Sequence, residues 1–268
     1  MQDDLTTYER IASNRKTTKV MSECNLPLTD HRVLVERLLT CAAWAPFHRS
    51  CDRDHRNEEL AASGQPTGIE PWRFHILDSA ESRRLRSIAQ SMEAAGKIPA
   101  MLASALATII ATWLPNSPQS SVTSTAVSAN TNIWPADQVI DSPLSIDSES
   151  FEPTVENVEH IAAASAAVQS LLLAATAAGL RNYWSSGGVL RSPTILRLLG
   201  IPATQRVLGI IFLFPATLPD SSLVQAVGSK LRESRGPLEA WSRWVALDHP
   251  ESRGDFANCK VNEAYSGQ

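Results

Sequence analysis

The sequence has few cysteines and few charges, and it lacks the motifs of several large enzyme classes. Its four cysteines, Cys24, Cys41, Cys51 and Cys259, form no C-x-x-C pair and no dense disulfide framework, which favours a reducing compartment. No G-x-G-x-x-G, P-loop or G-x-S-x-G motif is present. Nothing therefore supports a Rossmann dinucleotide site, a kinase-type phosphate site or a serine-hydrolase nucleophile.

Charge and hydropathy exclude further classes. Charged residues make up 19% of the chain and the formal net charge is −4, which argues against a general nucleic-acid binder. The longest apolar run, residues 101–114, is shorter than the about 20 residues that a membrane-spanning helix needs. Asp3, Asp4 and Glu9 are untypical of a signal or transit peptide. We therefore expect a cytoplasmic protein with neither nucleic-acid nor membrane partners.

Hydrophobic periodicity predicts a mixture of helices and strands, and hence an α+β fold. The predicted helices are residues 29–43, 82–95, 155–180 and 192–199, with Thr29 and Ser192 as N-caps and Gly179 and Gly200 as terminators. The predicted strands are residues 71–77, 106–114 and 207–214, although 106–114 is also compatible with a buried helix. Residues 155–180 are apolar around most of the circumference, so this helix should lie in a core or a subunit interface.

Two polar segments interrupt this pattern. Residues 49–70 carry a charged run followed by Gly64, Pro66 and Gly68, which predicts a long loop or an insertion. Residues 115–150 are rich in Ser, Thr, Asn, Asp and Pro, and they bury too little apolar surface to offset their ordering entropy, so we expect a mobile surface insertion. We expect one domain over residues 8–247 that contains both segments, followed by a polar tail, 248–268.

Two short elements carry residues suited to bind a cofactor. Arg15, Lys16, Thr17 and Lys19 offer a donor fork, point charges and a hydroxyl, which suit phosphate, although a solvated basic segment has the same composition. Residues 183–188 include Gly187 and Gly188, which would let the backbone approach a flat ligand closely. An ordinary helix-to-loop turn is the alternative for this segment.

A third element is Ala45-Pro46-Phe47-His48, which is followed later by Pro71-Trp72-Arg73-Phe74. On its own, His48 is more often a hydrogen-bonded structural residue than a ligand. His48, Cys51 and His55 have metal-like spacing, but they supply only three ligands. We therefore expect no metal site.

In this order, the elements resemble the nitroreductase family of FMN-dependent enzymes, in particular its small single-domain branch. The family opens with a basic cluster like Arg15-Lys16-Thr17, with a further basic residue where Lys19 stands, and continues with Ala-Pro-x-His and Pro-Trp-Arg-Phe. The remaining matches are the Ala-x-Gly-Leu helix end at 177–180, the Trp-x-Ser-Gly loop at 184–187, the Ser-Pro helix, the strand ending near Pro215 and the Arg-x-Pro-Leu tail at 235–238.

The resemblance implies a nitroreductase-like fold, with a central, mostly antiparallel sheet flanked by helices and the long buried helix at a dimer interface. Arg15, Lys16 and Thr17 would hold the FMN phosphate and ribityl chain, and Lys19 would lie near the pyrimidine edge of the flavin. His48 would approach the flavin across the dimer interface. The ring system would be lined by Trp184, Ser185, Ser186, Gly187 and Gly188, and Arg235 is a candidate second phosphate ligand.

The implied activity is that of a homodimer in which NAD(P)H reduces FMN and a nitroaromatic, quinone-like or other conjugated acceptor is then reduced in a ping-pong cycle. No side chain need act catalytically, because the flavin carries the chemistry. One alternative is a different flavin chemistry on the same fold, such as reductive dehalogenation or flavin breakdown. Others are a flavin-binding or flavin-free relative that acts through interactions, or an unrelated α+β domain whose motifs match by chance.

Overall fold

The computed structural model describes residues 3–27, 29–63, 67–116, 154–230 and 235–245. The chain divides into two compact units, residues 1–229 and 230–268, which are treated separately. Most of the predicted polar insertion, from residue 117 on, and the whole predicted tail, 248–268, lie outside the described residues.

The first unit alternates helices and strands, as the sequence predicts. Its helices are α1 Asp4–Asn14, α2 Arg32–Ala43, α3 Arg53–Ser63, α4 Ser79–Gln90, α5 Ile98–Ser104, α6 Val155–Ala177, the 3₁₀ turn η1 Gly188–Arg191 and α7 Pro193–Leu198. Its strands are β1 Thr18–Ser22, β2 Trp72–Asp78, β3 Ala107–Trp113, β4 Arg181–Ser185, β5 Arg206–Phe214 and β6 Val224–Gly228. In the second unit, the described residues include one 3₁₀ turn, η3 Leu238–Ala240.

The central sheet has the strand order β2-β3-β5-β4, and every neighbouring pair is antiparallel. Its register places Ile109 of β3 opposite Ile211 of β5. A second, two-stranded sheet pairs β1 with β6, and one parallel bridge from Thr17 to Asn182 joins its start to β4. The expected α+β fold with a mostly antiparallel sheet is confirmed.

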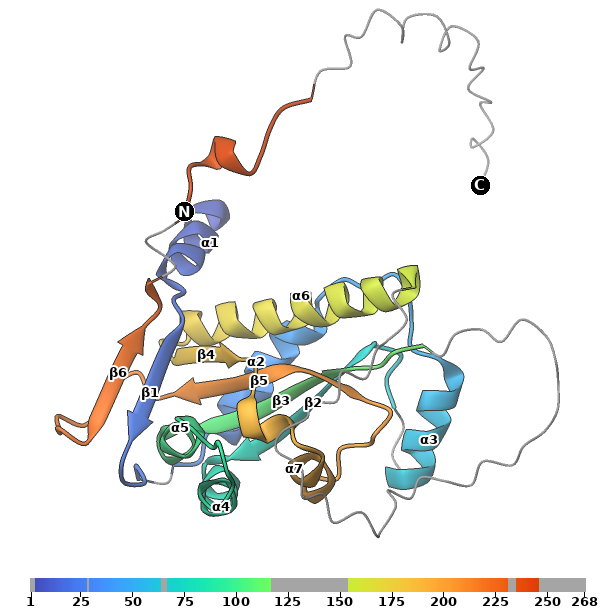
Figure 1. The fold of residues 1–268 in the computed structure, drawn as a ribbon. Helices are drawn as coiled ribbons and strands as arrows, with labels where there is room; N and C mark the ends of the chain where they lie inside the picture. Colours follow the sequence, from blue (N-terminus) through green and yellow to red (C-terminus); the bar gives the residue numbers. More distant parts are fainter. Residues whose placement is uncertain (1–2, 28, 64–66, 117–153, 231–234, 246–268) are drawn as a thin grey trace, which may run out of the picture. The chain divides into compact units, whose positions relative to one another are not determined.

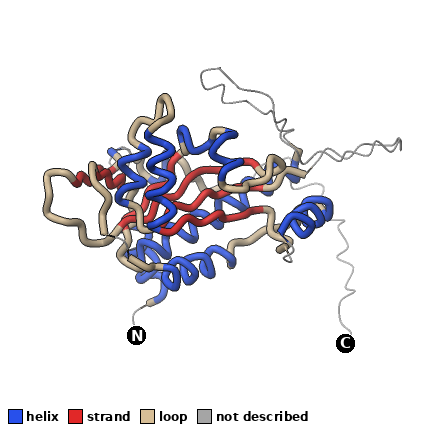
Figure 2. The backbone as a smooth tube through the Cα atoms, turned by 90° about the horizontal axis from the view of Figure 1, so that it is seen from below, coloured by secondary structure: helices blue, strands red, loops and turns tan. Residues whose placement is uncertain are grey.

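Helices cover both faces of the central sheet, as Figures 1 and 2 show. On one face, α2 and α6 pack against side chains such as Ile109, Ile211 and Leu213. On the other, α4, α5 and α7 pack against Ile110, Ile210 and Phe212. Because β3 and β5 are covered on both faces, they need continuous apolar sequences, and this explains the runs at 106–114 and 207–214.

The long helix α6 is the centre of the first of these layers. The Thr154 hydroxyl accepts a hydrogen bond from the Asn157 amide at its start. At its end Gly179 adopts φ 79°, and the amides of Gly179 and Leu180 donate back to Thr176 and Ala175. Among the described residues, α6 is also the one helix long and apolar enough to cross a membrane by length and composition alone, but its buried side chains belong to the core.

Several predicted boundaries differ from the structure. The helix expected from Thr29 begins at Arg32, and the Arg32 amide is capped by the Asp30 carboxylate instead of by Thr29. Residues 49–70 are not a continuous loop, because Arg53–Ser63 forms α3. The helix expected at 82–95 begins three residues earlier, where Asp78 caps the Glu81 amide. Helices α1 and α5 and the β1–β6 sheet were not predicted.

Candidate functional site

The structure brings together two of the predicted elements that are far apart in sequence. Thr17 forms the parallel bridge to Asn182 of β4, and its carbonyl accepts a hydrogen bond from the Ser229 amide at 3.0 Å. Two residues later, the Lys19 ammonium lies 4.8 Å from the centre of the Tyr183 ring. The basic N-terminal cluster therefore lies beside β4, which leads into the predicted cofactor loop.

The segment predicted as a loop over 183–188 is only partly a loop. Tyr183, Trp184 and Ser185 are the last residues of β4, and the chain turns only after Ser185. The prediction was wrong here because the Trp-x-Ser-Gly pattern spans the last two residues of the strand, Trp184 and Ser185, as well as the turn that follows. Pairing of Tyr183 with Phe212 and of Ser185 with Ile210 holds this end of the strand in the sheet.

The turn that follows β4 depends on two glycines with positive φ. Gly187 has φ 106° and Gly188 has φ 53°, a region that side chains disfavour. A Cβ at Gly187 would also lie 2.8 Å from Ile210 Cγ1. The Ser185 hydroxyl accepts a hydrogen bond from the Gly187 amide at 3.1 Å, and the Arg191 guanidinium donates to the Ser186 carbonyl at 3.0 Å. The turn is therefore held by side-chain hydrogen bonds to its backbone, from Ser185 on one side and Arg191 on the other.

Trp184 lies against the neighbouring strand at a glycine. A Cβ on Gly209 would lie 2.2 Å from the Trp184 indole nitrogen and 2.8 Å from the Ser185 carbonyl oxygen. Only glycine at this point of β5 lets the indole lie where it does. Sequence analysis placed Tyr183 in the predicted cofactor loop 183–188 but did not predict Gly209, whose contact with Trp184 arises only when β4 and β5 pair.

A pocket of about 240 Å³ opens beside the basic cluster. Lys16 lines it together with Arg181 and Asn182, while Thr176 and Gly179 contribute from the end of α6. Asn182 is only 2% exposed, and its Oδ1 has no hydrogen-bond partner although its Nδ2 donates to the Thr176 hydroxyl at 3.1 Å. A buried acceptor without a donor is costly, and this one belongs to a pocket that Lys16 and Arg181 make positively charged.

The positive charges of Lys16, Lys19 and Arg181 lie at this junction. Within the described part of the chain, no carboxylate lies at ion-pair distance from Lys16, Lys19 or Arg181. Sequence analysis missed Arg181 and Asn182. A signal was present, because two polar residues directly after a helix C-cap and before an aromatic pair are unusual at the start of a covered strand.

The other predicted site residues are not joined to this junction by any described contact. His48 is exposed on the loop after α2, next to Phe47, whose ring packs edge-on against Trp72 at 5.5 Å. The neighbouring Arg49 forms an ion pair with Glu159 of α6. Arg235 is exposed and belongs to the second unit. The structure does not test the proposed roles of His48 and Arg235.

A buried polar network connects α3 to the central sheet. Arg73 of β2 donates from Nη2 and Nε to the Glu59 carboxylate at 2.7 and 3.0 Å, and Gln205 donates to Glu59 at 2.9 Å. The Gln205 carbonyl oxygen accepts from His75 and Thr112, both at 2.7 Å. Burial lowers the pKa of His75 from its ordinary value of 6.5. Sequence analysis did not predict this network.

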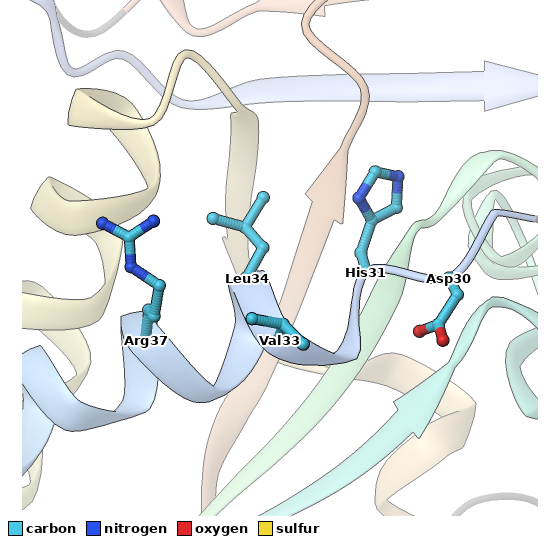
Figure 3. Close-up of a pocket in the computed structure, with 5 residues that line it drawn as sticks. All are labelled: Asp30, His31, Val33, Leu34 and Arg37. Carbon is cyan, nitrogen blue, oxygen red and sulfur yellow. The ribbon is translucent and has the colours of Figure 1, made fainter.

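A second pocket, of about 320 Å³, lies at the start of α2. Figure 3 shows His31, Leu34 and Arg37 along one side of the helix, with Asp30 and Val33 beside them. It contains none of the predicted site residues. Among the described residues, no group of three His, Cys, Asp or Glu side chains is arranged to hold a metal ion.

The fold is that of an α+β protein in which a basic strand, β1, lies beside β4 and the glycine turn follows β4. The sequence pattern of the nitroreductase family matches residues 27–213, which is more than half of the chain. The chain therefore belongs to the nitroreductase family, a family of flavin oxidoreductases. Among curated proteins, no relative matches it.

Solved structures of the same family resemble the chain at low sequence identity. A nitroreductase-like family protein from Bacillus cereus is 18% identical, with a TM-score of 0.49 over 89% of this chain and 100% of that one. A nitroreductase family protein from Streptococcus pneumoniae is 14% identical, with a TM-score of 0.48 and the same coverage. A protein from Desulfovibrio desulfuricans, solved in complex with FMN, is 18% identical, with a TM-score of 0.46 over 93% and 99%.

Proposed function

We propose that this protein is an FMN-dependent oxidoreductase that takes electrons from NAD(P)H and reduces nitroaromatic, quinone-like or other conjugated acceptors. The observation that carries the proposal is the junction in which the basic strand, with Thr17 bridged to Asn182 and Lys19 over Tyr183, lies beside the turn at Gly187. Family membership supports the flavin class. The donor and the acceptors are part of the proposal.

The residues present fit the phosphate and polyol parts of FMN. The phosphate carries negative charge, and Lys16 and Arg181 supply positive charge along the pocket, with Arg15 next to Lys16 in the sequence. The ribityl chain carries hydroxyl groups, and the polar side chains of Thr18 and Asn182 line the same pocket. We propose that Arg15, Lys16 and Thr17 hold this end of the cofactor, with Asn182 as an additional hydrogen-bonding partner.

The turn after β4 fits the flat ring of a flavin. Gly187 and Gly188 have positive φ and so turn the backbone tightly after β4, and we propose that the flat ring lies against this turn. We propose that Trp184, Ser185 and Ser186 line the rest of this wall. Lys19 would face the pyrimidine edge, where a fixed cation favours the negative charge that develops on reduction.

When bound, FMN would supply the redox chemistry by accepting two electrons from one substrate and passing them to the next. The side chains bind and orient the reactants, and their charges set how readily the cofactor is reduced. Because the two substrates would use the same space in turn, we expect ping-pong kinetics. No nucleophile or acid–base residue is required.

We further propose a homodimer. The surface formed by α2 and the start of α6 exposes large apolar side chains, since Val33 is 73%, Trp44 84% and Val155 67% exposed. Clusters of such residues on a folded surface commonly mark an interaction site. We propose that a second copy of the chain covers this surface. Because His48 lies only four residues after Trp44, it would then lie at the same interface, where it could approach the partner's cofactor.

The visible spectrum of the purified protein tests the proposed cofactor. We expect flavin absorption bands, either on purification or after FMN is added, and we expect NADH or NADPH to bleach them under nitrogen. A colourless protein that takes up no FMN would contradict the proposal. Flavin bands that neither nicotinamide bleaches would contradict the proposed donor alone, and a product assay would separate reduction from dehalogenation.

The phosphate role has its own test. Replacing Arg15 with Ala should weaken FMN binding by roughly 10-fold or more, because a hydrogen bond to a charged group contributes about 1.5–3 kcal/mol. The matched control is Arg84→Ala, since Arg84 is exposed on α4 and pairs only with Glu81 of the same helix. Equal FMN affinity for the two variants would disprove the role of Arg15.

A further inference from the structure

The contact between Lys19 and Tyr183 holds the lysine ammonium in place without neutralising its charge. The Lys19 Nζ lies 4.8 Å from the ring centre, which is within the range of a cation–π interaction. In the part of the chain that the structure describes, Lys19 has no carboxylate partner. A carboxylate would cancel most of the ammonium's charge, whereas a π face holds the ammonium and leaves its net charge intact.

The ring that holds Lys19 is itself held in place. Tyr183 stacks on Phe212 with centroids 6.3 Å apart and planes 15° apart, and Phe212 stacks on Phe214 at 6.1 Å and 3°. Both phenylalanines are 0% exposed. Pairing of Tyr183 with Phe212 across β4 and β5 fixes the backbone below the stack. The Tyr183 ring is therefore a rigid platform at the edge of a buried aromatic row.

We propose that Tyr183 is a positioning residue that fixes the Lys19 ammonium at the pyrimidine edge of the cofactor and thereby raises the cofactor's reduction potential. This inference rests on the proposed FMN site. Oxidised flavin is neutral in its ring and the reduced ring carries negative charge, so a cation held in one place stabilises the reduced form more. Without the ring, the flexible lysine would spend part of its time in solvent.

The test measures the midpoint potential of FMN bound to the wild type, Tyr183→Leu and Tyr183→Phe. In the wild type, the affinity for reduced FMN has a certain ratio to the affinity for oxidised FMN. We expect the Leu variant to lower this ratio about fivefold, a change within the range of one cation–π contact. For a two-electron couple at 29.6 mV per tenfold, this change lowers the potential by about 20 mV. Tyr183→Phe keeps the π face and should stay close to the wild type.

A double-mutant cycle separates positioning from a general structural effect. Lys19→Met removes the charge and retains the length of the side chain. If Tyr183 acts through Lys19, the change from Tyr183 to Leu should lower the potential in the wild-type background and leave it unchanged in the Lys19→Met background. A purely structural role would lower the potential equally in both backgrounds, and that result would overturn the inference.

The outcomes also separate this inference from the proposed function. If neither wild type nor variants bind FMN, the proposed function fails and the inference fails with it. If FMN binds and Tyr183→Leu has the wild-type potential, only the inference is overturned. Thermal unfolding of each variant checks the fold, and Tyr183→Met, which keeps more bulk, replaces the Leu variant if that variant does not fold.

Discussion

At the scale of single residues, Gly209 is a position in β5 with no room for a side chain. A Cβ there would lie 2.2 Å from the Trp184 indole nitrogen and 2.8 Å from the Ser185 carbonyl. We predict that Gly209→Ala displaces the indole and costs about 1–3 kcal/mol of unfolding free energy, as overpacking of a core commonly does. Urea unfolding measures the loss, and near-ultraviolet circular dichroism reports the movement of the indole.

The control for this substitution is Gly228→Ala. Gly228 is also a strand residue, the last one of β6, but a Cβ there would meet no atom within 4 Å. The two variants differ in steric environment and share the same change in unfolded-chain entropy. If Gly228→Ala were as destabilising as Gly209→Ala, the crowding at Trp184 would not be the cause.

The buried imidazole of His75 makes stability depend on pH. Burial lowers its pKa below the ordinary 6.5, and the neighbouring Arg73 acts in the same direction, whereas the Gln205 hydrogen bond and the Glu59 charge oppose it. The unfolded chain therefore binds more protons than the folded chain just below pH 6.5, so unfolding becomes easier as the pH falls through that range. Urea unfolding between pH 7.5 and 5 should show this loss in the wild type.

The measurement is specific when variants are compared. We expect His75→Gln, whose amide can still donate to Gln205, to reduce the dependence of stability on pH below 6.5. The difference between this variant and the wild type gives the contribution of the His75 imidazole alone. An unchanged slope in His75→Gln would show that other groups cause the acid destabilisation.

At the scale of elements, α3 is attached to the sheet through a buried ion pair. Glu59 is 13% and Arg73 18% exposed, so water screens this pair weakly. We predict that Glu59→Gln leaves Arg73 without a counter-charge and costs about 3 kcal/mol. Urea unfolding measures the total loss, and hydrogen exchange should show that the amides of α3 lose protection before those of β3 and β5.

An exposed ion pair with the same separation provides the control for the Glu59–Arg73 pair. Glu81 and Arg84 also lie 2.7 Å apart, but they are 49% and 77% exposed on α4. Glu81→Gln should therefore cost less than about 0.5 kcal/mol. Similar losses in the two variants would contradict the view that burial gives the Glu59–Arg73 pair its importance.

Elements with local signals could be predicted from sequence, and elements stabilised by distant partners could not. The helix α7 was predicted with both ends because Ser192, Pro193 and Gly200 supply cap, first turn and terminator within a few residues. By contrast, α3 has a polar sequence without a clear apolar face, and Glu59 finds its partner on β2. Helix α5 was missed because its residues run without a break into the apolar sequence of β3.

At the scale of the whole molecule, the same distinction applies to the site. The glycine turn and the basic cluster were predicted from their residue types and order, and the family is confirmed. That Thr17 lies beside Asn182, and that Lys19 lies over Tyr183, depends on β1 crossing to the free edge of β4. No periodicity in either segment encodes such pairing, so Asn182 and Gly209 were not predicted as parts of the site, and neither was the contact of Tyr183 with Lys19.

The proposed dimer gives the last prediction. Trp44, 84% exposed at the end of α2, would be the largest side chain buried by a partner on this surface. Buried tryptophans are common hot spots worth at least about 2 kcal/mol, or roughly 30-fold in the dissociation constant. Because a twofold interface contains each residue twice, Trp44→Ser should weaken the dimer by more than this factor. Light scattering after size exclusion, over a range of concentrations, measures it.

The control variant is Ile88→Ser, since Ile88 is 37% exposed on α4, which covers the opposite face of the central sheet (Figure 1). It should remain dimeric at concentrations where Trp44→Ser is monomeric. His48 adds a functional consequence, because a site that needs the partner's residues loses them on dissociation. FMN affinity should therefore fall with dilution in Trp44→Ser and stay constant in Ile88→Ser. A wild type that is monomeric and binds FMN at full affinity would show that one copy of the chain completes the site.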